Sequence, residues 1–89
     1  MMHKSNNPYN TDYVNRKRQE LDRRLKEASK SAAEIADMLR ATNVYLSAMM
    51  NEHYGLPAYT QRQMADAAGM AYATFRRHLA NARKVVELP

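Results

Sequence analysis

The sequence predicts an all-α fold: a small helical domain whose C-terminal part holds two short helices joined by a tight turn, preceded by an amphipathic N-terminal dimerisation helix. Three observations predict it. Residues 12–53 contain neither glycine nor proline, the residues that most disfavour a helix interior. Apolar residues recur at helical spacing in this stretch and again after residue 72. With 89 residues, the chain has the length of one small domain. Such a domain has a modest core, and dimerisation would add to its stability.

The N-terminal part divides into an arm and a basic helix. Residues 1–11 are polar and without periodicity, so we expect a disordered arm there, followed by a basic amphipathic helix over residues 12–30. Two series of residues with a period of seven form an imperfect coiled-coil seam over residues 12–53. The series are Val14, Leu21, Ala28, Ile35, Thr42 and Met49, and Arg18, Leu25, Ala32, Leu39, Leu46 and His53. We predict that Val14, Leu21 and Leu25 pair two copies of the chain.

Two arrangements of residues 12–53 fit this seam. A single long helix can pair with a second copy, or the chain can break near residues 29–31. The break is favoured, because uncapped helices beyond about 25 residues are unusual outside coiled coils. Ser31 and Glu34 also have the spacing of a capping box, which would start a second helix. That helix would end at Gly55 and support the C-terminal part.

Residues 31–89 form the second predicted unit. Thr60 and Gln63 have the spacing of a capping box, which predicts a helix start. Gly69 falls where this helix must end, because glycine adopts the left-handed conformation without steric cost. A second helix is predicted over residues 72–86. Its buried stripe contains Phe75, Leu79, Ala82 and Val86, and that of the first helix contains Met64, Ala65 and Ala68.

Residues 61–80 combine a small residue in the middle of the first helix (Ala65), a glycine at the turn (Gly69) and a hydrophobic residue after it (Met70). In these features the segment resembles the bacterial helix-turn-helix DNA-binding domain. The run T-F-R-R-H-L, residues 74–79, is similar to the recognition helix of LuxR-type domains, often written T-V-x-x-H-L. The first helix and the turn are equally similar to phage-repressor-like domains. The sequence departs from the pattern at Ala71 and Ala73, where many members carry a Ser or Thr cap.

Helical geometry predicts which side chains face the DNA in such a domain. A step of 100° per residue puts Arg77 opposite the buried stripe and Arg76 at its flank. An arginine so placed can donate two hydrogen bonds to guanine, worth roughly 1–3 kcal/mol of discrimination. The predicted base-reading residues are Tyr72, Ala73, Thr74, Arg76 and Arg77. The predicted phosphate contacts, which position the protein without reading sequence, are Thr60, Gln61, Arg62, Asn81, Arg83 and Lys84.

Charge and composition narrow the function classes. Residues 1–30 carry eight Lys and Arg against four acids, residues 31–59 one against three, and residues 60–89 five against two. Two basic ends suggest that both approach a polyanion. The chain lacks cysteine, its three histidines lie far apart, and no nucleophile–base pair or glycine-rich loop is present. We therefore expect no enzyme, metal, cofactor, small-molecule ligand or membrane partner.

The sequence thus predicts a DNA-binding transcriptional regulator, a repressor of bacterial, phage or plasmid type, in the cytoplasm and associated with the nucleoid. Its predicted partners are double-stranded DNA and a second copy of the chain. Two alternatives stay open. The protein can serve plasmid transfer, partition or replication through the same DNA contacts, or it can be an adaptor that docks on another protein through the seam of residues 12–53.

Overall fold

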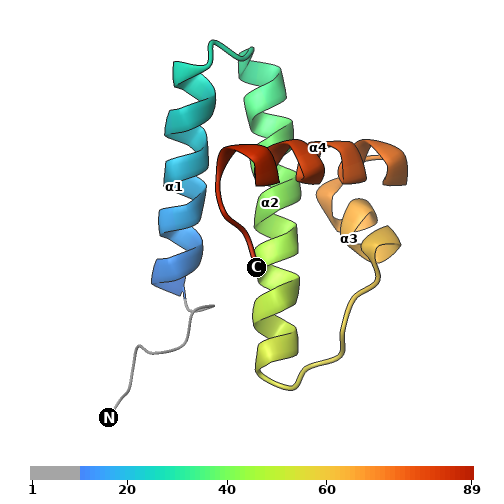
Figure 1. Ribbon diagram of the computed structural model, residues 1–89. Coiled ribbons are helices and arrows are strands. Elements are labelled where there is room, and N and C mark those ends of the chain that lie inside the picture. Colours follow the sequence, from blue (N-terminus) through green and yellow to red (C-terminus); the bar gives the residue numbers. More distant parts are fainter. Residues whose placement is uncertain (1–10) are drawn as a thin grey trace.

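Two long helices, α1 (Thr11–Glu27) and α2 (Ala32–His53), run antiparallel side by side, and two shorter helices, α3 (Gln61–Ala68) and α4 (Tyr72–Val85), pack against α2 (Figure 1). The computed structural model describes residues 11–89. All regular elements in this range are helices, which confirms the predicted all-α class. The predicted arm lies outside the described residues, except that Thr11 begins α1.

The chain breaks between α1 and α2, as the sequence favoured. Ser29 takes a left-handed conformation, with φ of 61°. The amide of Lys30 donates to the carbonyl of Leu25 at 3.2 Å, which closes the end of α1 in a Schellman-type cap. The hydroxyl of Ser31 then accepts from the amide of Glu34 at 3.1 Å and starts α2. The two helices therefore fold back on each other within one chain.

This fold-back bears on the prediction that the seam of residues 12–53 pairs two copies of the chain. Val14, Leu21 and Leu25 are buried in the core of a single copy, with Leu21 and Leu25 fully inaccessible. Leu21 and Leu25 share a cluster with Ile35 and Met38 of α2. The prediction that these side chains of α1 pair two copies is wrong, because the partner helix they cover is α2 of the same chain.

The α3–α4 pair is joined by a tight glycine turn. Thr60 and Gln63 form the expected reciprocal capping box at the start of α3. Gly69 ends α3 in the left-handed conformation, with φ of 72°, and the amide of Met70 reaches back to the carbonyl of Ala65 at 3.1 Å. Ala71 precedes α4 and provides no side-chain cap. The helix nevertheless begins at Tyr72, the residue predicted from the sequence.

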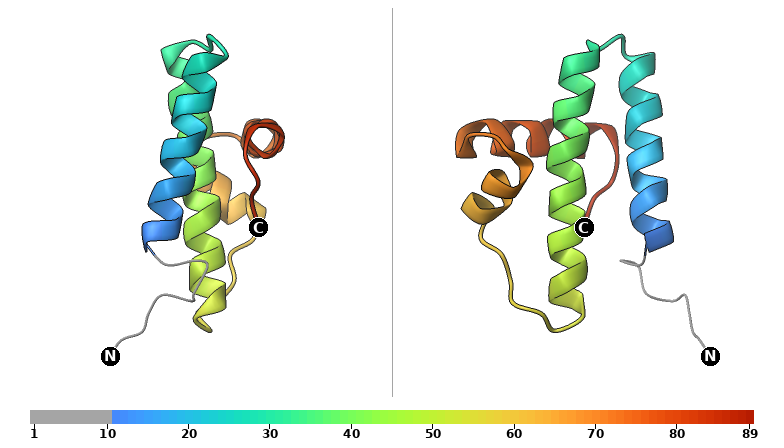
Figure 2. Two further views of the ribbon diagram at one scale, coloured as in Figure 1. Left: turned by 60° about the vertical axis from the view of Figure 1, so that its left-hand side comes forward. Right: turned by 180° about the vertical axis from the view of Figure 1, so that it is seen from behind.

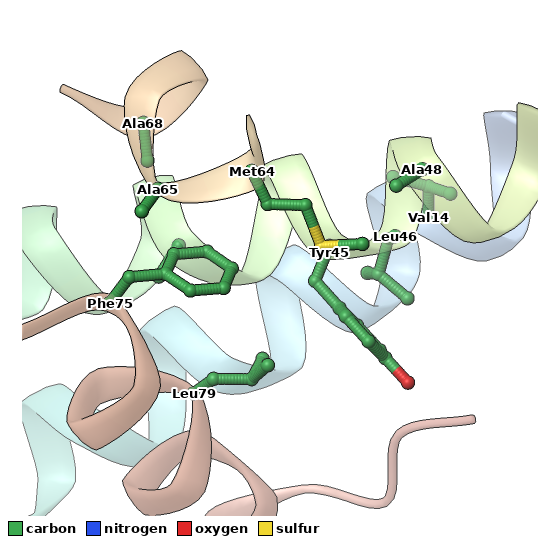
Figure 3. Packing of buried hydrophobic residues seen from close by; sticks show 10 residues of the cluster. Val14, Tyr45, Leu46, Ala48, Met64, Ala65, Ala68, Phe75 and Leu79 are labelled. Atoms are coloured by element: carbon green, nitrogen blue, oxygen red, sulfur yellow. The ribbon is translucent and has the colours of Figure 1, made fainter. Parts of the chain in front are cut away.

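Phe75 of α4 lies at the centre of the core, between Ala65 of α3 and Leu79 of its own helix (Figure 3). Helix α2 contributes Tyr45 and Leu46 to the same cluster. A second cluster joins α4 to α1 through α2 and contains Leu21, Leu25, Ile35, Met38, Ala82 and Val86. Helix α4 is thus held by one face, which packs against α3, α2 and α1.

Helix α4 crosses one face of the α1–α2 pair, and the residues after it turn back along that face (Figure 2). The hydroxyl of Tyr45 donates to the carbonyl of Pro89, which holds this tail against α2. The opposite side of α4 faces away from the core. Among residues 11–89, no helix combines the length and the apolar character needed to cross a membrane.

Candidate nucleic-acid interface

The outward face of α4 is a continuous stripe of exposed residues. It alternates small and cationic side chains at helical spacing, and its members are Ala73, Arg76, Arg77, Ala80, Arg83 and Lys84. The opposite face is buried and holds Phe75, His78, Leu79 and Ala82. Helix α4 contains no aspartate or glutamate. The charged side chains that this helix exposes are therefore all cationic.

The cations of this stripe have no acidic partner within residues 11–89. On α1, by contrast, most cations are paired within the helix: Arg24 lies 3.2 Å from Glu20, Lys26 lies 3.0 Å from Asp22 and Arg23 lies 3.4 Å from Glu27. Such pairs neutralise the charge of α1 locally, although each contributes little to stability. Among residues 11–89, acids therefore compensate the cations of α4 less than those of α1.

The predicted base-reading residues gather at the first turns of α4. Ala73, Arg76 and Arg77 are exposed, while Tyr72 and Thr74 are half-buried. The Tyr72 ring is covered by two guanidinium groups: the Cζ atom of Arg62 lies 4.3 Å from its centroid and that of Arg76 lies 5.6 Å from it. Both distances are within the range of cation–π attraction, worth about 0.5–1 kcal/mol at exposed sites.

The predicted phosphate contacts fall into two groups. Thr60, Gln61 and Arg62 surround the start of α3 and adjoin the base-reading set through the Arg62–Tyr72 contact. The second group, Asn81, Arg83 and Lys84, lies in the last turns of α4, roughly 13–18 Å beyond Tyr72 along the helix axis at 1.5 Å per residue. The guanidinium of Arg83 rests over the ring of Tyr45 at 5.0 Å from its centroid. The whole set forms one elongated surface rather than a single cluster.

Arg40 of α2 was not among the residues predicted from the sequence, yet it binds the end of α3 beside this surface. Its Nε donates to the carbonyl of Ala68 at 3.1 Å, and its guanidinium also lies 2.8 Å from Asp37. The other oxygen of Asp37 is 3.9 Å from Nε2 of His78, which is buried on α4. Arg40 thus caps the C-terminal end of α3, where cations are favoured. The sequence spacing of Asp37 and Arg40 is typical of an ion pair within a helix. Nothing in the sequence indicated the bond from Arg40 to Ala68, because Ala68 lies 28 residues further along the chain.

The site has no features of a metal centre: among residues 11–89, no group of three or more His, Cys, Asp or Glu side chains is placed to hold an ion. Its chemistry is that of guanidinium, ammonium, amide and hydroxyl donors along one helix. Such donors suit the phosphates and base edges of a nucleic acid. Comparisons with protein-family models, with curated proteins and with solved structures found no match to this chain.

Proposed function

We propose that the protein binds double-stranded DNA in a sequence-dependent manner and regulates transcription, as a repressor of bacterial, phage or plasmid type. The observation that carries this proposal is the exposed stripe of α4, which bears four cations without any acidic partner in the described range. A helix supported on one face by α2 and α3, and cationic on the other, has the form needed to enter a major groove.

Sequence reading is assigned to the first turns of α4. Arg77 is exposed and makes no ion pair, side-chain hydrogen bond or ring contact within residues 11–89, so its guanidinium donors are available to a guanine. Ala73 precedes it by one turn and leaves room for close approach, and its methyl group can contact a thymine methyl. The cations flanking these residues supply affinity through the phosphates.

We further propose that two copies bind an inverted repeat, with half-sites about 34 Å apart or a multiple of that distance. The contact between the copies does not involve Val14, Leu21 or Leu25, which are buried inside each copy. Repression then follows from occupancy of an operator, in the cytoplasm at the nucleoid.

Of the two alternatives, the adaptor role would use the part of the seam that is not buried within the chain. Leu21, Leu25 and Leu46 are fully buried, whereas Arg18 and His53 are exposed and Leu39 and Met49 are half-buried. A role in plasmid transfer, partition or replication uses the same DNA interface. The location of the preferred site, upstream of a gene or at an origin, distinguishes these roles.

The test is fluorescence-anisotropy binding at physiological salt, with DNA from upstream of the protein's own gene and a scrambled duplex. Wild-type protein should prefer the first duplex by 10³-fold or more, as specific DNA-binding proteins typically do. Arg77→Ala should lose about 5- to 150-fold of that preference, the equivalent of 1–3 kcal/mol, by weakening specific binding alone. Arg62→Ala should weaken both duplexes by the same factor.

Arg23→Ala is the matched control, because it removes an exposed cation of α1 that is already paired with Glu27. It should leave both affinities unchanged. Equal and salt-sensitive binding of the two duplexes by wild type would reject a sequence-specific regulator.

A further inference from the structure

Tyr72 joins two cations that belong to different helices. Arg62 is the second residue of α3, and Arg76 lies one turn after Tyr72 on α4. Their guanidinium carbons lie 4.3 Å and 5.6 Å from the centroid of the one Tyr72 ring. Two like charges gathered on a single ring repel each other, and the ring face offsets part of that repulsion. The arrangement is therefore poised to gain from a nearby anion.

The nearest acid along α3 does not supply that anion. Asp66 follows Arg62 by four residues, the spacing at which helical ion pairs form. Within residues 11–89, however, Arg62 takes part in no ion pair and donates no side-chain hydrogen bond, and the same holds for Arg76. Arg62 lies over Tyr72 instead.

Stacking leaves the hydrogen-bond donors of both arginines available. A guanidinium group uses its flat face against a ring, while its five N–H groups point outward in its plane. Such an edge fits the oxygens of a phosphate, often with two parallel bonds. The first turn of α3, which carries Arg62, adds the backbone amides of Gln61 and Arg62, since the amide of Gln63 already donates to Thr60. Two guanidinium groups, one from the first turn of α3 and one from α4, therefore lie at one ring.

We propose that Arg62, Tyr72 and Arg76 form a clamp for one phosphodiester group of a nucleic-acid backbone. Arg62 and Arg76 hold the phosphate, and Tyr72 is a positioning residue that fixes both guanidinium groups before the anion arrives. The clamp moves Arg76 from the predicted base-reading set to the backbone and leaves Arg77 as the reading arginine. This inference rests on the proposed DNA-binding function, and the experiment below separates the two.

The first arm uses no DNA. The side-chain Nε–Hε resonances of the arginines are followed by NMR while inorganic phosphate is added at constant ionic strength. The resonances of Arg62 and Arg76 should move together and saturate on one curve, in wild type and in Tyr72→Phe, which keeps the ring. Tyr72→Leu should abolish this coupled response while the protein remains folded. Arg77, exposed on the same stripe without a ring contact, is the internal control and should respond without saturation.

The second arm measures anisotropy with the preferred and the scrambled duplex over a range of salt. Arg62→Gln and Arg76→Gln should each weaken both duplexes by the same factor, roughly two- to fivefold, and should lower the slope of log affinity against log salt by about one. In a Tyr72→Leu background the effect of each substitution should be smaller, because the arginines no longer act as a unit.

Three outcomes are decisive. If Arg76→Gln weakens only the preferred duplex, Arg76 reads a base and the clamp is rejected. If Arg62 and Arg76 respond to phosphate no differently from Arg77, the clamp is rejected as well. If their coupled response is present but neither duplex binds, the clamp stands as an anion site and it is the proposed DNA-binding function that fails.

Discussion

Gly69 sets the angle between α3 and α4, because it is the residue at which the chain leaves α3 in a left-handed conformation. A β-carbon built at this position meets no heavy atom within 4 Å. Its cost would therefore be conformational rather than steric. Gly69→Ala should lower the free energy of unfolding by about 1–2 kcal/mol, the cost of a left-handed residue with a side chain, as measured by urea denaturation.

Gly69→Asn provides the graded control for this prediction. Asparagine tolerates the left-handed conformation better than alanine, so it should cost less although it is larger. A destabilisation by asparagine equal to or above that by alanine would point to a steric conflict instead, and would contradict the conformational explanation.

The residues of the candidate site were predictable only in part at this scale. A rotation of 100° per residue was enough to separate the exposed Arg77 from the buried Leu79. It could not reveal that Arg62 rests on Tyr72, because that contact depends on the angle of the Gly69 turn. Nor could it reveal the bond from Arg40 to Ala68. Contacts between elements require the packing of the elements, which a local pattern does not contain.

The helices α1 and α2 illustrate the same limit at the level of elements. The period of seven correctly identified Leu21, Leu25 and Leu46 as buried. The prediction from the sequence attributed this period to a contact between two copies of the chain. The same spacing occurs where two helices of one chain pack together and where helices of two chains do, so it does not distinguish the two cases. The left-handed Ser29 and the Ser31 cap decide between them by turning α2 back onto α1.

Leu21→Ala tests this intramolecular assignment. The side chain is fully buried, so its truncation should lower the free energy of unfolding by about 2–5 kcal/mol. The difference in unfolding midpoint between wild type and variant should be the same at every protein concentration, since the cost falls within one chain.

Arg18→Ala is the control for this prediction, because Arg18 belongs to one of the two seven-residue series but is exposed on α1. Its substitution should change stability by less than about 0.5 kcal/mol. A wild-type midpoint that rises with concentration, together with loss of association in Leu21→Ala, would restore the seam as a contact between copies.

For the molecule as a whole, the distribution of charge matters more than its total. The net charge of +5 includes cations of α1 that are paired with acids of the same helix, and cations of α4 that are not. A paired cation releases fewer counterions on binding, because its acid remains beside it. The salt dependence of DNA binding should therefore be controlled by α4 rather than by the more numerous cations of the N-terminal half.

Two double variants that each remove two positive charges test this prediction. Arg83→Gln with Lys84→Gln removes the cations at the end of α4, and should lower the slope of log affinity against log salt by about two, at roughly 0.9 for each phosphate that is no longer neutralised. Arg23→Gln with Lys26→Gln removes two paired cations of α1 and should leave the slope unchanged. Anisotropy titrations between low and physiological salt measure both. Equal reductions of the slope by the two double variants would show that binding depends on net charge alone. They would contradict the proposal that α4 is the surface that contacts the DNA.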